Sequence, residues 1–545
     1  MQLSPSAHTD TFSRDSLPAP ELWPDLEFTL PELKYPDRLN AADELLTPVI
    51  AAGGAGRRCL LSPTETWSYG QVADLACQIA RVLTEDLGVL PGNRVLLRGP
   101  NNPWLAACWL AVLKSGAVAV PTMPMLRAAE LTSICAIARV DVALCDHRFT
   151  ADLAAAAPGL LVVEFGGQGP GDLTALTAAK PAEFASVQTA ADDVAAIHFT
   201  SGTTGRPKAA MHFHRDMLVV ADTFSARVLR PTADDLFTGT PPLAFAFGIG
   251  ALLLFPLRVG AASLLLERAS PAELADFIAG QGATVLSTAP TAYRAMLAAG
   301  QADKLRGLRR AVSAGEHLPE STWTAFHEAT GVRIIDGIGS TELLHIFIAA
   351  ADDDIKPGST GIAVPGYTAA VLDLDGKPMA DGEPGRLAVK GPTGCRYLND
   401  ERQRGYVQDG WNLTGDTYIR DADGYFWYQA RSDDMIISGG YNIAGPEVED
   451  VLLSHPDVTE CGVVGAPDEA RGQIVKAYVV LRDGAVGDAA EARELQDLVK
   501  ERIAPYKYPR AVEFVATLPR TSTGKLQRFR LREQAAGTSA GNAAG

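Results

Sequence analysis

Residues 194–208 read VAAIHFTSGTTGRPK, and the chain on either side repeats their pattern of strand followed by loop. The apolar run from Val194 to Phe199 predicts a buried strand. The nine residues after it contain two glycines, four hydroxyl side chains and the cations Arg206 and Lys208. Glycines let a backbone turn and expose its N–H groups, which is what a polyphosphate needs beside a cation. We predict a phosphate-binding loop, with a solvated Ser/Thr/Gly turn as the alternative. It is not a Walker A loop, because Pro207 precedes the lysine and no Ser or Thr follows it.

Strands and helices alternate on both sides of this loop. Ser68 and Gln71 form a capping box that predicts a helix reaching to Gly88. Further helices are expected over 103–115 and 319–331, and strands over 94–98, 117–121, 284–287, 310–313 and 332–336. Such alternation predicts crossover units and a parallel sheet covered by helices on both faces.

The expected fold class is α/β. It comprises a large N-terminal body of parallel-sheet α/β layers, a β-rich subdomain, and a small mobile C-terminal α+β domain. A chain of 545 residues is long enough for more than one core, since single cores stop growing at roughly 250 to 300 residues. We expect an N-terminal arm over 1–40, a large domain over 41–432 with Asp-Gly turns and β structure at about 355–430, a small domain over 433–530, and a flexible tail over 531–545.

The composition excludes several classes of protein. With 48 basic and 65 acidic side chains the net charge is −17, so nucleic acid is not expected as a partner. Seven scattered cysteines without a CxxC pair favour a reducing, cytoplasmic environment over a disulfide framework or a zinc site. No secretory signal is expected at the N-terminus. The uncharged run Thr238 to Leu257 is as long as a membrane span, but its prolines and glycines favour a buried, turn-rich segment, so no membrane partner is expected.

A second loop candidate reads DGIGSTE from Asp336 to Glu342, again after an apolar strand. Open α/β sheets bind ligands beyond the carboxyl ends of their strands, so we expect both loops to meet at one crevice. Glu342 could there hold Mg²⁺ together with phosphate oxygens. The alternative role for Glu342 is that of an acid at a helix N-terminus, where the helix dipole favours negative charge.

These two loops resemble motifs of the acyl-adenylate-forming superfamily. So do Gly415-Asp416, the segment Ala430 to Asp434 and the segment Pro519 to Lys525, in the same order, and the resemblance spans roughly residues 60–530. It implies a two-step ligase. A carboxylate attacks the α-phosphate of MgATP to give an acyl-adenylate and pyrophosphate, after which the small domain rotates and the thiol of coenzyme A displaces AMP.

The resemblance also implies roles for particular residues. Glu342, with Thr341 beside it, would bind Mg²⁺; Asp416 would accept from the ribose hydroxyls with help from Arg431; Asp433 would be the hinge. Lys525 would reach the carboxylate and the α-phosphate, where two anions need a cation between them. The other expected ATP-binding residues are Thr200, Ser201, Gly202, Thr203, Thr204, Gly205, Lys208, Gly315, Glu316, Asp336 and Gly337.

The expected acyl pocket is flat and apolar. Phe245 stands where most of the family has a histidine, and no acid occurs between Phe237 and Leu266 to hold an amino acid by its ammonium group. The segment Phe245 to Gly248, together with Gly339 to Phe347, resembles benzoate-type CoA ligases. The segments Met211 to Asp216 and Ser438 to Pro446 resemble 2-aminobenzoate-CoA ligases more closely, which implies an aromatic acid as substrate. The pocket residues are Phe245, Ala246, Phe247, Gly248, Ile338, Gly339 and His345.

Three histidines have open roles. His345 follows Glu342 by three residues, which predicts a shared helix face and a hydrogen bond to a carboxylate or an ortho substituent; a structural role is the alternative. His212 and His214 are expected to alternate on a strand, and we favour structural roles for both.

Coenzyme A is expected to pass the glycine run Ser438, Gly439 and Gly440, where missing Cβ atoms admit a pantetheine arm; a turn beside the hinge is the alternative. Two functional alternatives remain: loading of an aryl acid onto a carrier protein, and a CoA ligase for a non-aromatic acid. A monomer or a homodimer is expected.

Overall fold

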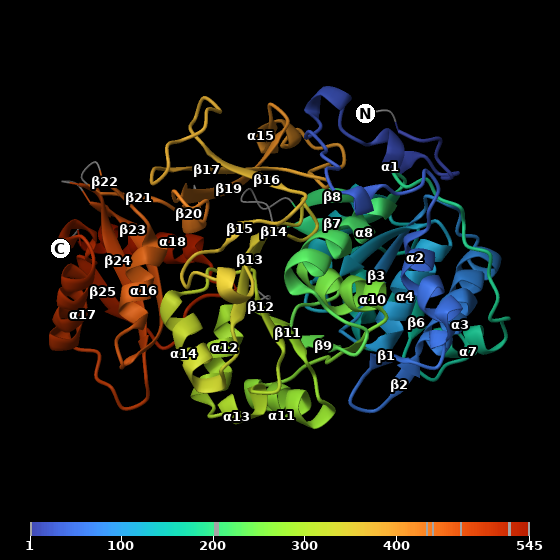
Figure 1. Ribbon diagram of the computed structural model, residues 1–545, viewed down its shortest axis with the longest axis horizontal. Coiled ribbons are helices and arrows are strands. Elements are labelled where there is room, and N and C mark those ends of the chain that lie inside the picture. The colour runs from blue at the N-terminus through green and yellow to red at the C-terminus, as the bar shows by residue number, and fades with distance from the viewer. Residues whose placement is uncertain are drawn as a thin grey trace.

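The computed structural model describes residues 3–200, 207–431, 434–438, 441–468, 471–520 and 525–542. Two large sheets form most of the molecule, a third sheet lies along one edge of them, and a small C-terminal domain lies at one end (Figure 1). The predicted parallel-sheet body with a smaller C-terminal domain is confirmed.

The first large sheet carries the phosphate-loop candidate at one edge. Its strand order is β6 (Leu161–Phe165), β5 (Val142–Asp146), β3 (Arg94–Arg98), β4 (Val118–Thr122), β7 (Val194–Thr200) and β8 (Lys208–Phe213). All neighbours are parallel except β7 and β8, which form an antiparallel pair. The expected loop therefore connects β7 directly to β8.

The second large sheet has nine strands. Its order is β15 (Ile362–Ala363), β14 (Ile346–Ala349), β13 (Ile334–Gly339), β12 (Arg310–Ser313), β11 (Val285–Thr288), β9 (Leu236–Gly239), β10 (Ala262–Leu264), β1 (Arg58–Leu61) and β2 (Thr66–Ser68). The strands from β1 to β13 in this order are parallel, whereas β2, β14 and β15 pair antiparallel at the ends.

Helices cover both sheets (Figure 1). Helix α3 (Tyr69–Arg81) starts with the predicted capping box of Ser68 and Gln71, and α4 (Pro103–Lys114) is buried almost throughout because it packs against α2, α3 and the strands β3 and β4. The other helices of this body are α1 (Phe12–Asp15), α2 (Ala41–Val49), α5 (Ala128–Ala138), α6 (Thr150–Ala156), α7 (Leu173–Ala178), α8 (His214–Val220), α11 (Pro271–Gln281), α12 (Pro290–Ala298), α13 (Ala302–Leu305) and α14 (Glu320–Thr330).

The uncharged run Thr238 to Leu257 is buried, but it is more helical than the sequence suggested. It contains α9 (Ala246–Ile249), the π-helical turn Gly250–Leu254 and the start of α10 (Phe255–Val259). Pro256 lies where the π-helical turn passes directly into α10. Among the described residues no helix combines the length and the hydropathy needed to span a bilayer.

The N-terminal arm contacts the part of the large body that contains the first sheet, and ion pairs and a hydrogen bond hold it there. Arg14 contacts the buried carboxylates of Asp192 and Asp193 at 3.4 and 3.2 Å, and the backbone N–H of Ser4 donates to Asp192 at 3.1 Å. The arm ends where Asn40 caps α2.

An antiparallel sheet links the large body to the small domain. Its strands are β16 (Thr368–Leu372), β17 (Pro384–Lys390), β18 (Val407–Gln408), β19 (Trp411–Arg420) and β20 (Phe426–Arg431), with α15 (Gln403–Tyr406) at one end. The β-rich texture expected at about 355–430 coincides with this sheet.

The small domain has its own apolar core. Its elements are β21 (Ile436–Ser438), β22 (Tyr441–Ile443), α16 (Gly445–Leu453), β23 (Val458–Asp468), β24 (Gly472–Leu481), α17 (Ala489–Arg502), β25 (Ala511–Phe514) and α18 (Arg528–Asn542). The flexible tail predicted from residue 531 is wrong up to Asn542, because α18 continues through it. Leu531 and Ala535 are each 1% exposed and belong to a second apolar cluster of this domain.

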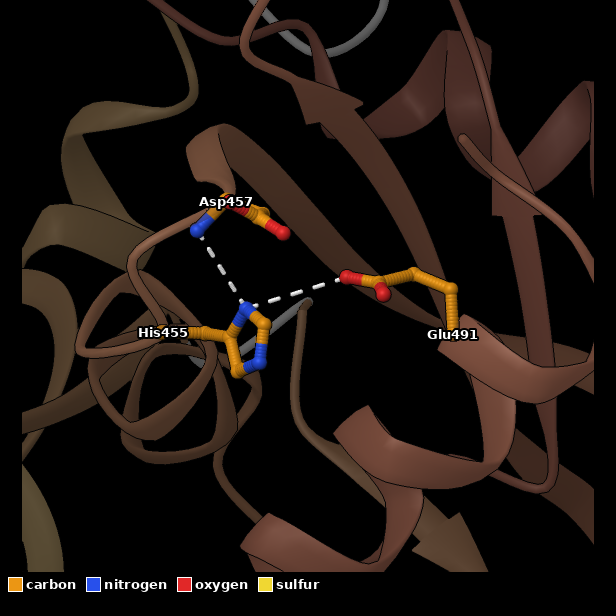
Figure 2. Close-up of side chains that lie close together, drawn as sticks. All are labelled: His455, Asp457 and Glu491. Atoms are coloured by element: carbon orange, nitrogen blue, oxygen red, sulfur yellow. Dashed lines mark hydrogen bonds and ion pairs between the residues drawn. The ribbon is translucent and has the colours of Figure 1, made fainter. Parts of the chain in front are cut away.

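His455 joins two helices of the small domain (Figure 2). Its Nδ1 accepts the backbone N–H of Asp457 at 3.3 Å, and its Nε2 lies 3.3 Å from Glu494 on α17. Glu491, in the first turn of α17, lies 3.7 Å from Nδ1. Because the lone pair of Nδ1 is engaged by the Asp457 amide, the proton belongs on Nε2, facing Glu494. The group therefore ties the end of α16 to α17.

Candidate active site

The predicted phosphate loop lies between paired strands. Thr200 ends β7 and pairs in register with Lys208, the first residue of β8. Ser201, Gly202, Thr203, Thr204 and Gly205 lie outside the described residues, so their predicted role stays a prediction. The structure places Lys208 at the carboxyl end of β7, as the strand-and-loop pattern predicts.

Glu342 lies next to Lys208, joined to it by a tyrosine. The hydroxyl of Tyr397 donates to Oε1 of Glu342 and accepts from Nζ of Lys208 at 3.2 Å. Glu342 is 7% exposed and Tyr397 is fully buried. Tyr397 is not predicted from the sequence, because no pattern around it indicates a role and its partners are 55 and 189 residues away.

Thr341 and Glu342 occupy a turn. The segment 341–345 contains no helix, and Leu344 has a positive φ of 70°. The predicted shared helix face of Glu342 and His345 is therefore wrong, and so is the alternative of a helix N-terminal acid. The Ser340 hydroxyl at the start of the turn pairs with the hydroxyl of Tyr406 at 3.2 Å.

Asp336 and Gly337 lie inside β13 rather than in a loop after it. Asp336 pairs in register with Ser313 of β12, and the side chain of Ile346 packs against Gly337. Burial raises the pKa of Asp336 to about 7, while His317 opposes the shift. Near neutral pH this carboxyl is therefore partly protonated.

Asp416 and Arg431 form a pair across β19 and β20. They are in register, and Nη1 of Arg431 lies 3.0 Å from Oδ1 of Asp416. Burial raises the pKa of Asp416, and Arg431 opposes this shift. Gly415 before it has φ +79°, and a Cβ there would lie 2.9 Å from the Arg431 guanidinium. This position inside β19 therefore requires glycine.

Gly315 and Glu316 follow β12 and face the small domain. Glu316 accepts from the Thr291 hydroxyl at 2.7 Å and lies 3.5 Å from Nη1 of Arg520. Gly315 has φ +91°, and a Cβ on it would lie 3.7 Å from Cε of Lys525. Lys525 therefore reaches the large domain at the loop after β12.

The charge environment of Lys525 is that of a crevice residue. Desolvation lowers its pKa, although the side chain stays accessible to solvent, and Glu316, Asp416 and Glu342 act in the opposite direction. These three acids come from three different loops or strands. Lys525 thus interacts electrostatically with all three acids.

Two of the predicted acyl-pocket residues, Phe247 and Gly339, lie close to His345. Phe245 precedes α9, and Ala246, Phe247 and Gly248 form its first turn. The ring of His345 lies 5.8 Å from that of Phe247, 5.4 Å from Phe224 and 4.5 Å from Phe255. Ile338 is half-buried at the end of β13, and Gly339 packs against the backbone of His345. Burial lowers the pKa of His345 to about 3, so the ring is neutral.

The remaining predicted residues are placed only in part. Ser438 is buried at the end of β21, whereas Gly439, Gly440 and the hinge candidate Asp433 lie outside the described residues. His212 belongs to β8, but His214 begins α8, so the predicted alternation on one strand is wrong. Both are fully buried, and His214 accepts the backbone N–H of Ala41 through Nδ1 at 3.2 Å.

Comparison with known proteins places these features in a family. The model described as AMP-binding enzyme matches residues 49–397, and that of the AMP-binding enzyme C-terminal domain matches residues 447–525. Benzoate–CoA ligase of Thauera aromatica is 35% identical over 92% of this chain and 98% of its own.

Two solved structures are similar in fold and sequence. The anthranilate CoA ligase AuaEII in complex with anthranoyl-AMP has a TM-score of 0.89 at 35% identity, covering 93% of this chain and 99% of that one. A benzoate CoA ligase from Burkholderia xenovorans LB400 has a TM-score of 0.83 at 31% identity, covering 91% and 100%. The chain therefore belongs to the AMP-binding enzyme family, in its aryl-CoA ligase group.

Proposed function

We propose that this protein activates an aromatic carboxylic acid, 2-aminobenzoate or a benzoate-like acid, with ATP and transfers it to coenzyme A. The observations that support the proposal are the electrostatic interactions of Lys525 with Asp416 and Glu342, the Asp416–Arg431 ion pair, and the hydrogen bonds that join Lys208 to Glu342 through Tyr397. These side chains supply cations for phosphates and a carboxylate for ribose or metal, next to an apolar aromatic group of residues.

In the first step a carboxylate oxygen of the acid attacks the α-phosphorus of ATP, and the bond to the β-phosphate oxygen breaks to release pyrophosphate. Both reactants are anions, so the reaction needs a cation where their charges meet. Lys525 supplies it from the small domain. Lys208 faces the β- and γ-phosphates, and Asp416 accepts from the ribose hydroxyls while Arg431 holds its carboxylate in place.

Glu342 is suited to Mg²⁺. The ion takes hard oxygen ligands and is commonly held by one or two carboxylates together with substrate phosphates. When bound, it would neutralise phosphate charge. The chain's own contribution is a nearly buried carboxylate whose Oε1 is fixed by the Tyr397 hydroxyl.

In the second step the sulfur of coenzyme A attacks the acyl carbon, and AMP leaves with the electrons of the acyl–oxygen bond. Ser438, at the end of β21, and the glycines that follow it in the sequence are our candidates for the thiol's approach, because glycines lack the Cβ atoms that would obstruct a pantetheine arm.

The aromatic acid is supported by the pocket chemistry. Phe245 and Phe247 present flat apolar rings, and the uncharged segment around them offers no acid for an amino group on an aliphatic carbon. Relatives named for benzoate and anthranilate point the same way.

The test is a panel of benzoate, 2-aminobenzoate, salicylate, 4-hydroxybenzoate and a medium-chain fatty acid. Each is incubated with enzyme, MgATP and coenzyme A, and pyrophosphate release and the CoA thioester are measured. We expect aryl-CoA from at least one benzoate. Activity restricted to the fatty acid would contradict the aromatic substrate, and adenylate formation without transfer to coenzyme A would favour a carrier protein as acceptor.

His345 is our candidate for recognising a ring substituent. Its neutral ring can hydrogen-bond an ortho amino group, or it can be an apolar wall among three phenylalanines. We expect His345→Phe to lower kcat/KM for 2-aminobenzoate about tenfold relative to benzoate. If kcat/KM changes equally for both acids, His345 is an apolar part of the pocket lining and does not hydrogen-bond the substituent.

A further inference from the structure

A phenol joins the two charged groups that are expected to bind MgATP. The hydroxyl of Tyr397 donates to the carboxylate of Glu342 and accepts from the ammonium of Lys208 at 3.2 Å. One hydroxyl can do both at once, because it has one donor and two lone pairs. The result is a chain of hydrogen bonds from cation to phenol to anion, in which each bond polarises the next.

The ring of Tyr397 also contacts Lys208. Nζ of Lys208 lies 5.2 Å from the centre of the Tyr397 ring and 5.9 Å from that of Tyr406. The two tyrosines pack edge to face at 5.7 Å. The lysine is thus held by aromatic faces and a hydroxyl, without a direct ion pair to Glu342 among the described contacts.

The backbone at Tyr397 is fixed by the strand that carries Lys208. Tyr397 forms a bridge with Ala210 of β8, and the N–H of Leu398 donates to the carbonyl of Ala209 at 2.9 Å. The N–H of Tyr397 itself donates to the Gln403 side chain at 2.9 Å. A fully buried side chain on a backbone held at these points cannot move far, so its hydroxyl is a fixed reference for both partners.

We propose that Tyr397 is a positioning residue that holds the Glu342 carboxylate and the Lys208 ammonium apart and in fixed orientation for MgATP. Without its hydroxyl, the two charges would be free to pair directly and to neutralise each other, withdrawing both from metal and phosphate. The inference rests on the proposed function, because it assigns Tyr397 to the adenylate-forming step.

The test compares Tyr397→Phe with wild type. The substitution keeps the ring and its contact with Lys208 and removes only the hydroxyl. Pyrophosphate release is measured with ATP and the best acid of the panel while MgCl₂ is varied. We expect the Mg²⁺ concentration for half-maximal rate to rise about tenfold and kcat to fall about ten- to a hundredfold, since a hydrogen bond to a charged group is lost. Release of thioester from a preformed aryl-adenylate should change less than threefold.

Tyr69→Phe is the matched control. It also removes a buried phenol that donates one hydrogen bond, here to the carbonyl of Ala261 at 2.7 Å, but it lies outside the crevice. It should lower thermal stability comparably without changing the Mg²⁺ dependence. Tyr397→His, whose shorter ring cannot reach both partners, is a second variant and should also need more Mg²⁺.

The outcomes separate the inference from the function. Wild type that forms no AMP from any acid overturns the proposed function. Active wild type with an unchanged Mg²⁺ dependence in whichever Tyr397 variant folds overturns the positioning role, as does equal loss of both half-reactions.

Discussion

In the proposed function, Lys525 is the residue on which the chemistry depends most. It comes from the small domain but lies beside Gly315 of the large one, among the acids Glu316, Asp416 and Glu342. A cation held among carboxylates before substrate arrives is preorganised, so it need not be recruited when the two anions meet.

We expect Lys525→Ala to lower adenylate formation about 10²- to 10³-fold, the usual effect of removing one preorganised charge-stabilising group. Thioester formation from a preformed aryl-adenylate should remain, because that step joins no two anions. Single-turnover assays of each half-reaction measure both. Lys500→Ala is the control, since Lys500 lies on α17 and pairs with Asp497. Parallel loss of both half-reactions would contradict this role.

The buried carboxyl of Asp336 makes the free energy of unfolding depend on pH, and its raised pKa fixes the direction of that dependence. Its pKa is about 7 in the folded chain against 3.8 ordinarily, so between these values the folded state binds more protons than the unfolded state. The stability linked to this group is present below about pH 4 and is lost as pH rises through 7. The difference corresponds to about 4 kcal/mol at most.

Asp336→Asn, which mimics the protonated acid, should therefore be more stable than wild type at both pH 5 and pH 8, with the larger gain at pH 8. Thermal unfolding at the two pH values measures this. Asp375→Asn, in an exposed turn, should give the same difference from wild type at both. A pH-independent effect of Asp336→Asn would show that the carboxyl is not desolvated.

Residues that act through local pattern could be predicted, and those that act through distant contacts could not. The pattern of strand and loop correctly predicts that Lys208 lies at the end of β7. The expected partnership of Asp416 with Arg431 is present as an ion pair. Tyr397 escaped notice because its role exists only once β8 and the turn at Glu342 meet. His345 was misassigned because Leu344 adopts a positive φ, which no helical spacing rule anticipates.

At the scale of elements, the prediction that differs most from the structure is the flexible tail from residue 531, where the structure has helix α18. The segment 531–545 is rich in Gly, Ala and Ser, which resembles an unfolded tail. Alanine is also the best helix former, and the decisive factor is tertiary: Leu531 packs against Gly462 of β23, where a Cβ would come within 2.8 Å of it. A composition rule cannot register that contact.

Leu531→Ala should destabilise the small domain by about 2 to 5 kcal/mol, the usual cost of truncating a buried leucine. The contact it removes joins α18 to β23, close to the segment that carries Lys525. Chemical denaturation measures the change, and Glu533→Ala on the exposed side of the same helix should be within about 0.5 kcal/mol of wild type. Equal, small effects of both variants would mean that α18 does not dock.

At the scale of the whole molecule, the small domain is docked with Lys525 beside Gly315 of the large body, the orientation that our proposed adenylate-forming step needs. Arg520 bridges Glu316 of the large domain and Glu460 of the small one, at 3.5 and 2.6 Å. His317 lies 3.1 Å from Asp450 on α16 and stacks on Tyr428 at 5.3 Å. These two contacts hold the small domain in one orientation relative to the large body. The contact between His317 and Asp450 depends on pH, because His317 can lose its proton.

His317 makes docking sensitive to pH in a definite direction. Burial lowers its pKa, but Asp450, with Asp336 and Glu449, outweighs this and raises it above the ordinary value. Docking therefore gains stability while the imidazole is protonated and loses it as pH rises through the raised pKa. Adenylate formation should decline over that range more steeply than thioester formation from preformed adenylate. His317→Gln, which keeps a neutral hydrogen-bond donor, should flatten the difference, whereas Lys500→Ala should leave it unchanged. If the two half-reactions follow the same pH profile in wild type and in His317→Gln, the His317–Asp450 pair does not govern the orientation of the small domain.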